Sequence, residues 1–111
     1  HDDLDLAMIY DSFTYTTLVS LEGLGFCEPG EGPDFVKAQR TAPGGDFPLN
    51  TSGGGLSYTH TGMYGMFLLV EATRQLRGET GERQVPDCKI ALVNGTGGQL
   101  SSTGTAILAV D

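Results

Sequence analysis

Two side chains in this sequence could move a proton or hold a developing negative charge near neutral pH. His60 stands immediately before an apolar run with helical character, and Tyr10 closes an apolar run near the start of the chain. A helix N-terminus favours a neutral imidazole, which can accept a proton or donate to an oxyanion. A tyrosine can donate a hydrogen bond or relay a proton. His60 and Tyr10 are the candidate catalytic residues, against the alternatives of a structural histidine and a tyrosine that only packs.

Glycines and polar side chains in two further stretches could form the wall of the same site. One stretch runs from Asn50 to Gly55 and the other from Asn94 to Ser102. Loops at the ends of rigid elements often carry functional groups, and glycine lets the backbone approach a ligand closely. Asn50 could instead shape its own turn, and the tyrosines near His60 could instead pack. The candidate binding residues are Asn50, Gly53, Gly54, Tyr58, Tyr64, Asn94, Gly97 and Gly98.

Composition limits the classes of protein to which this chain could belong. Its 111 residues, 39% hydrophobic and 18% charged, suit one folded domain over residues 1–111. The net charge of −8 argues against nucleic acid or an anionic membrane surface as the main partner. No apolar run approaches the ~20 residues that span a bilayer. Cys27 and Cys88 have neither metal-binding spacing nor a disulfide framework, so we expect reduced thiols, no metal site and a cytoplasmic location.

Two helices are expected to carry the candidate residues. The first has its N-cap at Asp11 or Ser12 and stops at Gly25. The second covers residues 63–78, and because its first half is apolar on every side, we expect it to be buried all round.

Three strands complete an α/β layered domain. The chain opens on a strand almost at its first residue, as if the piece had been cut from something longer. The prolines and glycines between residues 26 and 61 predict a long functional loop with a short ordered stretch near 35–40. The expected strands cover residues 4–10, 89–93 and 105–110, and residues 94–102 form a glycine-rich hairpin loop between the last two.

The motifs around these residues resemble the C-terminal half of thiolases. The similarity rests on Asn50-Thr51-Ser52-Gly53-Gly54, on His60-Thr61-Gly62-Met63-Tyr64-Gly65 and on Glu71–Gly78. The runs Tyr10–Thr14 and Leu21–Cys27 resemble the lipid-transfer-protein-like or sterol-carrier-type branch. That branch includes degradative thiolases and aldolases that release a ketone from a steroid side-chain thioester. The resemblance implies the C-terminal half of the thiolase fold, lacking its first strand, as a fragment of a longer two-half enzyme.

Two departures from the thiolase pattern bear on the chemistry. Thiolases place an acid/base cysteine where this sequence has Asn94, and an asparagine or histidine where it has Tyr10. The nucleophilic cysteine of thiolases belongs to the N-terminal half, and neither Cys27 nor Cys88 lies in a matching motif. These departures favour a retro-aldol or a degenerate site over ordinary thiolysis. A milder departure is Thr61, which stands where the family has proline.

The resemblance leaves two classes of function. One is an enzyme that makes or cleaves a carbon–carbon bond beta to a CoA thioester, with coenzyme A as substrate and no other cofactor, inactive as this chain alone. The other is a non-catalytic module that binds acyl-CoA, lipid or a partner. The implied partners are the missing N-terminal half and an OB-fold, zinc-containing subunit. We also expect an exposed apolar face and a homodimer formed through it.

Overall fold

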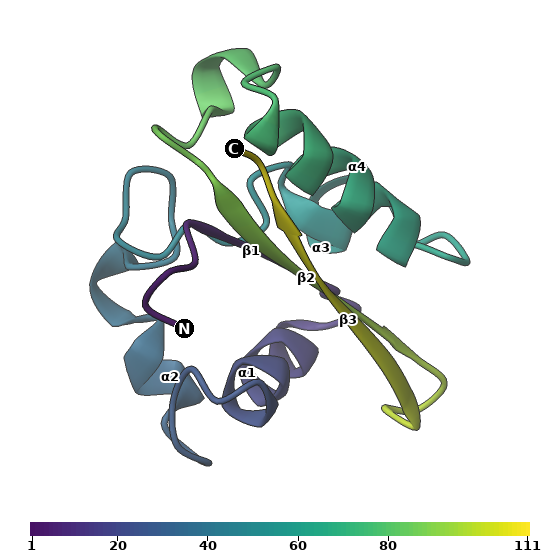
Figure 1. Ribbon diagram of the computed structural model, residues 1–111. Coiled ribbons are helices and arrows are strands. Elements are labelled where there is room, and N and C mark those ends of the chain that lie inside the picture. Colours follow the sequence, from purple (N-terminus) through teal and green to yellow (C-terminus); the bar gives the residue numbers. More distant parts are fainter.

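The computed structural model describes all residues 1–111, folded around a three-stranded mixed sheet (Figure 1). Strand β1 (Leu6–Ile9) pairs in parallel with β2 (Ile90–Gly97), and β2 pairs antiparallel with β3 (Ser102–Ala109). The sheet order is β1-β2-β3, with β2 in the centre. This architecture confirms the α/β class. No helix of the chain has the length and apolar character needed to cross a membrane.

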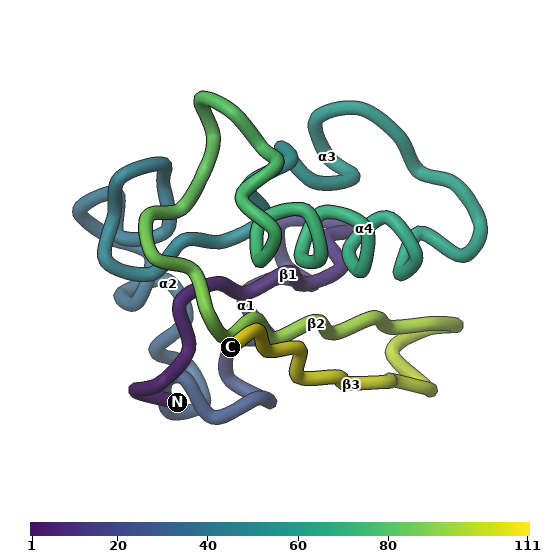
Figure 2. Tube along the Cα trace, turned by 45° about the horizontal axis from the view of Figure 1, so that its top comes forward, coloured from purple at the N-terminus to yellow at the C-terminus, as the bar shows by residue number.

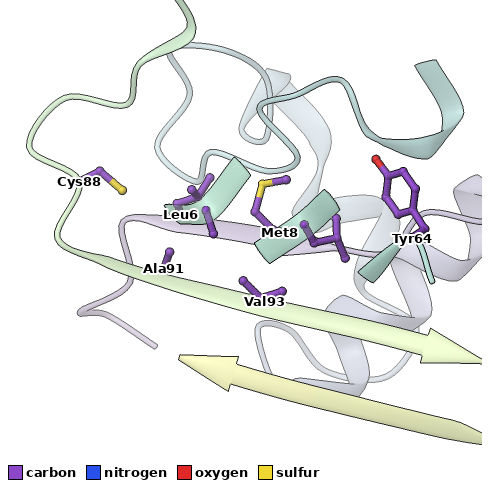
Figure 3. Packing of buried hydrophobic residues seen from close by; sticks show 8 residues of the cluster. Leu6, Met8, Tyr64, Cys88, Ala91 and Val93 are labelled. Carbon is purple, nitrogen blue, oxygen red and sulfur yellow. The ribbon is translucent and has the colours of Figure 1, made fainter. Parts of the chain in front are cut away.

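Helices cover both faces of the sheet, so the core has two layers. Leu6 and Met8 of β1 pack with Leu68 of α4 (Gly65–Leu76) in one cluster, whose buried residues Figure 3 shows as sticks. Ala7 and Ile9 point the other way, into a cluster with Leu21 of α1 (Thr14–Gly23). All four residues of β1 are buried, because successive side chains of a strand face opposite sides and both sides are covered here.

Helix α1 ends as expected and begins differently. Gly25, with φ of 82°, ends it: its N–H donates to Glu22 O and the next N–H, of Phe26, donates to Leu21 O. This is the glycine C-terminal motif. The N-cap is Phe13, without a side-chain hydrogen bond, so the expected cap at Asp11 or Ser12 is wrong. Asp11 is instead engaged by a distant segment, described below.

The segment 26–61 is more ordered than a long loop. It contains α2 (Gly32–Phe35), the 3-10 helix η1 (Lys37–Gln39) and α3 (Gly54–Tyr58). The ordered stretch expected near 35–40 is therefore present, and α3 was not foreseen. Between η1 and α3, Leu49 forms an isolated parallel β-bridge with Ala7. The side-chain amide of Asn50 bonds to both the N–H and the C=O of Ile9, each at 2.8 Å. The backbone groups of Pro48 and Asn50 also bond to Ala7, so this part of the segment pairs with the edge of β1.

Helix α4 is buried on one face only, so the expectation that it is buried all round is wrong for this chain. Leu68 and Ala72 contact the sheet, whereas Met66, Phe67 and Val70 are exposed. The helix is apolar on more than one side, but this chain covers only the side that faces the sheet. The expected exposed apolar face is present. The chain continues from α4 through the 3-10 helix η2 (Gly81–Arg83) to β2.

The hairpin strands are longer than expected. Pairing continues past Asn94 and Thr105 to Gly97 and Ser102, leaving residues 98–101 as the turn. The expected loop over residues 94–102 is therefore mostly strand, because cross-strand hydrogen bonds hold the glycines in the ladder. Helix α4 packs against this hairpin, mainly against β2, and Figure 2 shows the helix running alongside that strand.

Candidate active site

The structure brings Tyr10 and His60 together although they are 50 residues apart. Tyr10 follows β1 directly, and its N–H donates to Asn94 O at 2.9 Å, which continues the β1–β2 pairing. His60 lies in the connection between α3 and α4. Tyr10 Oη is 3.2 Å from His60 Nδ1, within hydrogen-bond distance, and the two rings stack with centroids 6.1 Å apart. A phenol and an imidazole in this arrangement can pass a proton between them.

A cavity of about 800 Å³ lies beside this pair. Its wall is formed by the end of β1, the start of α1, the connection before α4 and the β2–β3 turn. Figure 2 shows that connection and that turn projecting from the same end of the molecule. No charged side chain lines the cavity. Five candidate residues meet there, namely Tyr10, His60, Tyr64, Gly97 and Gly98.

Tyr64 is a buried wall residue of the cavity. Its ring lies 5.4 Å from the Tyr10 ring, and its hydroxyl donates to Tyr58 Oη at 3.2 Å. Burial, followed by the hydrogen bond with Tyr58, raises the pKa of Tyr64 well above its usual value. Tyr64 therefore keeps its proton at neutral pH and can support the Tyr10 ring. Tyr58 does not line the cavity, and it reaches the site through Tyr64, by this hydrogen bond and by ring packing with centroids 6.0 Å apart.

Four other candidate residues lie outside this cavity. Asn94 is buried in the hairpin, where its amide donates to Thr103 Oγ1 at 3.0 Å and to Thr105 Oγ1 at 2.8 Å. Asn50 has φ of 50°, and its side chain hydrogen-bonds to the backbone of Ile9 in β1. Gly53 and Gly54 lead into α3 with φ of 95° and 71°, a backbone conformation that favours glycine. In this structure these four residues shape the elements around the site.

The position of His60 relative to α4 differs from the expected one. The helix begins at Gly65 with Tyr64 as its N-cap, so His60 is separated from the first turn by residues 61–64. The dipole of α4 therefore does not act on His60, since its effect falls off within the first turn. The Tyr10 hydroxyl is the group that actually faces the imidazole.

Sequence reasoning missed several residues of the cavity wall. Phe13, Tyr15, Met63 and Leu100 all line it and are all exposed. Large apolar side chains that remain exposed around a cavity suit an apolar ligand. Phe13 and Met63 lie three positions after Tyr10 and His60, but apolar residues at such positions are equally typical of helix packing.

Neither thiol belongs to the site. Cys27 and Cys88 are free, and neither lines the cavity. Burial raises the pKa of Cys88, with Asp5 adding to the effect. Burial also raises the pKa of Cys27, helped by the carboxylates of Glu22, Glu31 and Glu28. Both thiols are therefore poor nucleophiles at neutral pH. No group of three or more His, Cys, Asp or Glu side chains is arranged to hold a metal ion.

Known proteins resemble the chain in both sequence and fold. The family model described as thiolase C-terminal domain-like matches residues 1–110. Sterol carrier protein 2 of Homo sapiens is 38% identical over 97 residues, which cover 86% of this chain and 18% of that protein. Acetyl-CoA acetyltransferase of Methanothermobacter thermautotrophicus is 37% identical over 109 residues, covering 97% and 28%.

A solved structure shares the fold. The structure named Ltp2-ChsH2(DUF35) aldolase superimposes with a TM-score of 0.74 at 37% identity, and the match covers 93% of this chain and 24% of that one. The chain thus spans about a fifth to a quarter of the length of such relatives. It is related to thiolases, lipid-transfer proteins and aldolases, and it belongs to the thiolase C-terminal domain-like family.

Proposed function

We propose that this chain forms part of an acyl-CoA active site that makes or cleaves the carbon–carbon bond beta to the CoA thioester. Retro-aldol cleavage is the favoured reaction, with thiolytic acyl transfer as the other. The observation that carries the proposal is the Tyr10–His60 pair on the wall of an uncharged cavity. The names of an acetyltransferase and an aldolase among the relatives support the same chemistry.

In the retro-aldol direction the pair has a defined task. The imidazole of His60, assisted by the Tyr10 hydroxyl, takes the proton of the substrate's β-hydroxyl group. The oxygen lone pair then forms the new carbonyl, the bond between the α and β carbons breaks, and its electrons move into the thioester as an enolate. The enolate takes a proton at the α carbon to give the shortened acyl-CoA. No external oxidant or reductant is needed.

Two features of the chain favour this reaction over thiolysis. Thiolysis needs a group that shuttles a proton at the position where this chain has Asn94, and that amide is buried and hydrogen-bonded to Thr103 and Thr105. The apolar wall around Phe13 and Met63 suits the acyl group of the substrate. Coenzyme A enters as part of the substrate, and no other cofactor is required.

The rest of the enzyme is part of the proposal. We expect the exposed face of α4 to be covered by a second, N-terminal half, and the chain by itself to be inactive. In its absence, two copies of this chain would associate through that face as a homodimer. The relative whose name joins Ltp2 to ChsH2(DUF35) supports a further partner subunit, which we expect to be an OB-fold protein with zinc. A cytoplasmic location fits CoA chemistry.

The test is made in the complete enzyme that carries this chain. His60→Ala should lower kcat/KM for a β-hydroxyacyl-CoA by ~100-fold or more, since it removes a group that acts in the transition state. His1→Ala is the matched control, because His1 is the other histidine and bonds to Leu24 O far from the cavity. Unchanged turnover in His60→Ala would remove this residue from the mechanism.

A further inference from the structure

Asp11 is a buried carboxylate that the reaction described above does not use. It follows Tyr10 directly and is only 5% exposed. Its Oδ1 accepts the N–H of Gly55 at 2.7 Å, and its Oδ2 accepts the N–H of Leu56 at 3.2 Å. These two N–H groups belong to the first turn of α3, where helical N–H groups have no partner within the helix. The side chain therefore joins the end of β1 to the start of α3.

The two glycines that begin α3, Gly54 and Gly55, leave room for this carboxylate. A Cβ on Gly54 would lie 2.2 Å from Asp11 Oδ2, closer than real side-chain carbons ever approach, and a Cβ on Gly55 would lie 3.1 Å from Oδ1. Gly54 also has φ of 71°. The close approach and the backbone conformation both require glycine at position 54, which gives this residue a reason unconnected with substrate contact.

The same link controls both members of the catalytic pair. Tyr10 is the neighbour of Asp11 in the chain, and His60 follows the single turn of α3 that Asp11 holds. At the far end of that turn, Tyr58 accepts the hydrogen bond from Tyr64, whose ring packs on Tyr10. Movement of α3 relative to β1 would therefore change the distance between the Tyr10 hydroxyl and the imidazole.

We infer that Asp11 is a positioning residue, whose carboxylate fixes α3 against β1 so that Tyr10 Oη and His60 Nδ1 remain in register. This inference deepens the proposed function, because it assigns a role within the same site. Asp11 does not line the cavity and needs no contact with substrate.

The first test is an NMR measurement on the 111-residue chain. Wild type should show nuclear Overhauser contacts between the stacked Tyr10 and His60 rings. Asp11→Asn puts an amide N–H₂ against a backbone N–H, so those contacts should be lost while backbone signals of β2 and β3 stay in place. Gly54→Ala should give the same loss by crowding the carboxylate from the other side.

The chain offers a matched control in Asp5. Its Oδ2 also accepts two backbone N–H groups, from Lys89 at 2.8 Å and Ile90 at 2.9 Å, away from the pair. Asp5→Asn should leave the ring contacts intact. Ring contacts that persist in Asp11→Asn would overturn the inference. So would loss of the whole fold in both Asp11→Asn and Gly54→Ala, because Asp11 would then hold the domain and not the pair.

Kinetics in the complete enzyme separates this inference from the proposed function. Asp11→Asn should lower kcat by ~10- to 100-fold with little change in KM, the effect expected when reacting groups are misplaced by about 1 Å. If the ring contacts are lost in Asp11→Asn while His60→Ala keeps full activity, the positioning role stands and the proposed function fails. If His60→Ala is inactive while Asp11→Asn keeps its kcat, the proposed function stands and the positioning role fails.

Discussion

Two polar clusters, one around the C-terminal half of α4 and one beside the connection that precedes α4, differ in how completely their groups are hydrogen-bonded. Near the C-terminal end of α4, the buried Glu71 accepts bonds from Arg83 Nε, Arg83 Nη2 and Thr51 Oγ1, each at 2.9 Å. The buried Gln75 amide donates to Arg83 O and accepts from Val85 N. Before its N-terminal end, His60 makes one side-chain hydrogen bond, to Tyr10, and its ring is exposed beside the cavity.

This difference separates polar groups that hold the fold from the pair that we propose acts on substrate. A buried carboxylate that accepts several hydrogen bonds from the protein, one of them from an arginine on each oxygen, stabilises the fold and offers little to a ligand. An imidazole with one hydrogen bond and a free face beside a cavity contributes little to folding and can bind or take a proton. We therefore expect substitutions at the Glu71 cluster to change stability, and substitutions at the Tyr10–His60 pair to change activity.

The largest effect on stability should come from Arg83→Ala. The substitution leaves the buried Glu71 carboxylate without its cation. Because the Arg83 side chain is itself 41% exposed and partly screened by solvent, we expect the free energy of unfolding to fall by about 2–3 kcal/mol, less than for a fully buried pair. Urea denaturation of the 111-residue chain measures this change. A loss under ~1 kcal/mol would show that solvent screens this ion pair as it screens a surface pair. The Glu71 cluster would then not be the structural counterpart of the Tyr10–His60 pair.

Asn94→Ala should have the next largest effect. It removes two hydrogen bonds from the buried amide to Thr103 and Thr105, with an expected cost of about 1–2 kcal/mol. Gln99→Ala, in the exposed turn of the same hairpin, should stay within ~0.5 kcal/mol. If thermal unfolding shows the same loss of stability in both variants, the hydrogen bonds of Asn94 do not stabilise the fold.

Glu71→Gln should cost about 1 kcal/mol at neutral pH, because hydrogen bonds to a charged acceptor are stronger than those to a neutral one. Burial raises the pKa of Glu71, but hydrogen bonds from Arg83, Thr51 and Gln75 more than offset this, and the pKa lies below its ordinary value of 4.5. The contribution is therefore present above that value and is lost as pH falls through the lower pKa of the folded state. Wild type should therefore lose its advantage over Glu71→Gln as the pH falls below 4.5. Parallel stability curves for the two proteins would contradict this assignment.

His60→Ala should have the smallest effect on stability, within ~0.5 kcal/mol of wild type, because the ring is exposed and makes a single hydrogen bond. Calorimetry of His60→Ala beside His1→Ala checks this expectation. If His60→Ala alone is destabilised by more than ~1 kcal/mol, His60 belongs with the structural groups.

Local patterns predicted the parts of the fold that depend on neighbouring residues. The stop at Gly25 follows from the conformation of one glycine, and the period of two along β1 gives its two buried faces. The capping of α3 by the Asp11 carboxylate could not be predicted, because its partner Gly55 is 44 residues away in the sequence. Local sequence also could not show that α4 is half exposed, since an apolar pattern shows that a face can be covered and not which chain covers it. The exposed apolar face was expected only from the family resemblance.

The candidate site was predictable only in part for the same reason. The residue types marked Tyr10 and His60 as groups that transfer protons, and the family resemblance placed them at one site. The positions of Asn50 and Asn94 depend on partners in β1 and β3, so their structural bonds could not be read from local sequence. The cavity wall at Leu100 required the turn geometry, where this residue has φ of 60°.

The most direct test of the central claim is where an acyl-CoA binds. A β-hydroxyacyl-CoA titrated into the 15N-labelled chain should give saturable shifts at Tyr10, His60, Gly97 and Gly98, and His60→Ala should weaken them. A second cavity of about 590 Å³, lined in part by Gly44 and Arg83, provides the internal comparison. Shifts confined to that second cavity, or no saturable shift at all, would contradict the account.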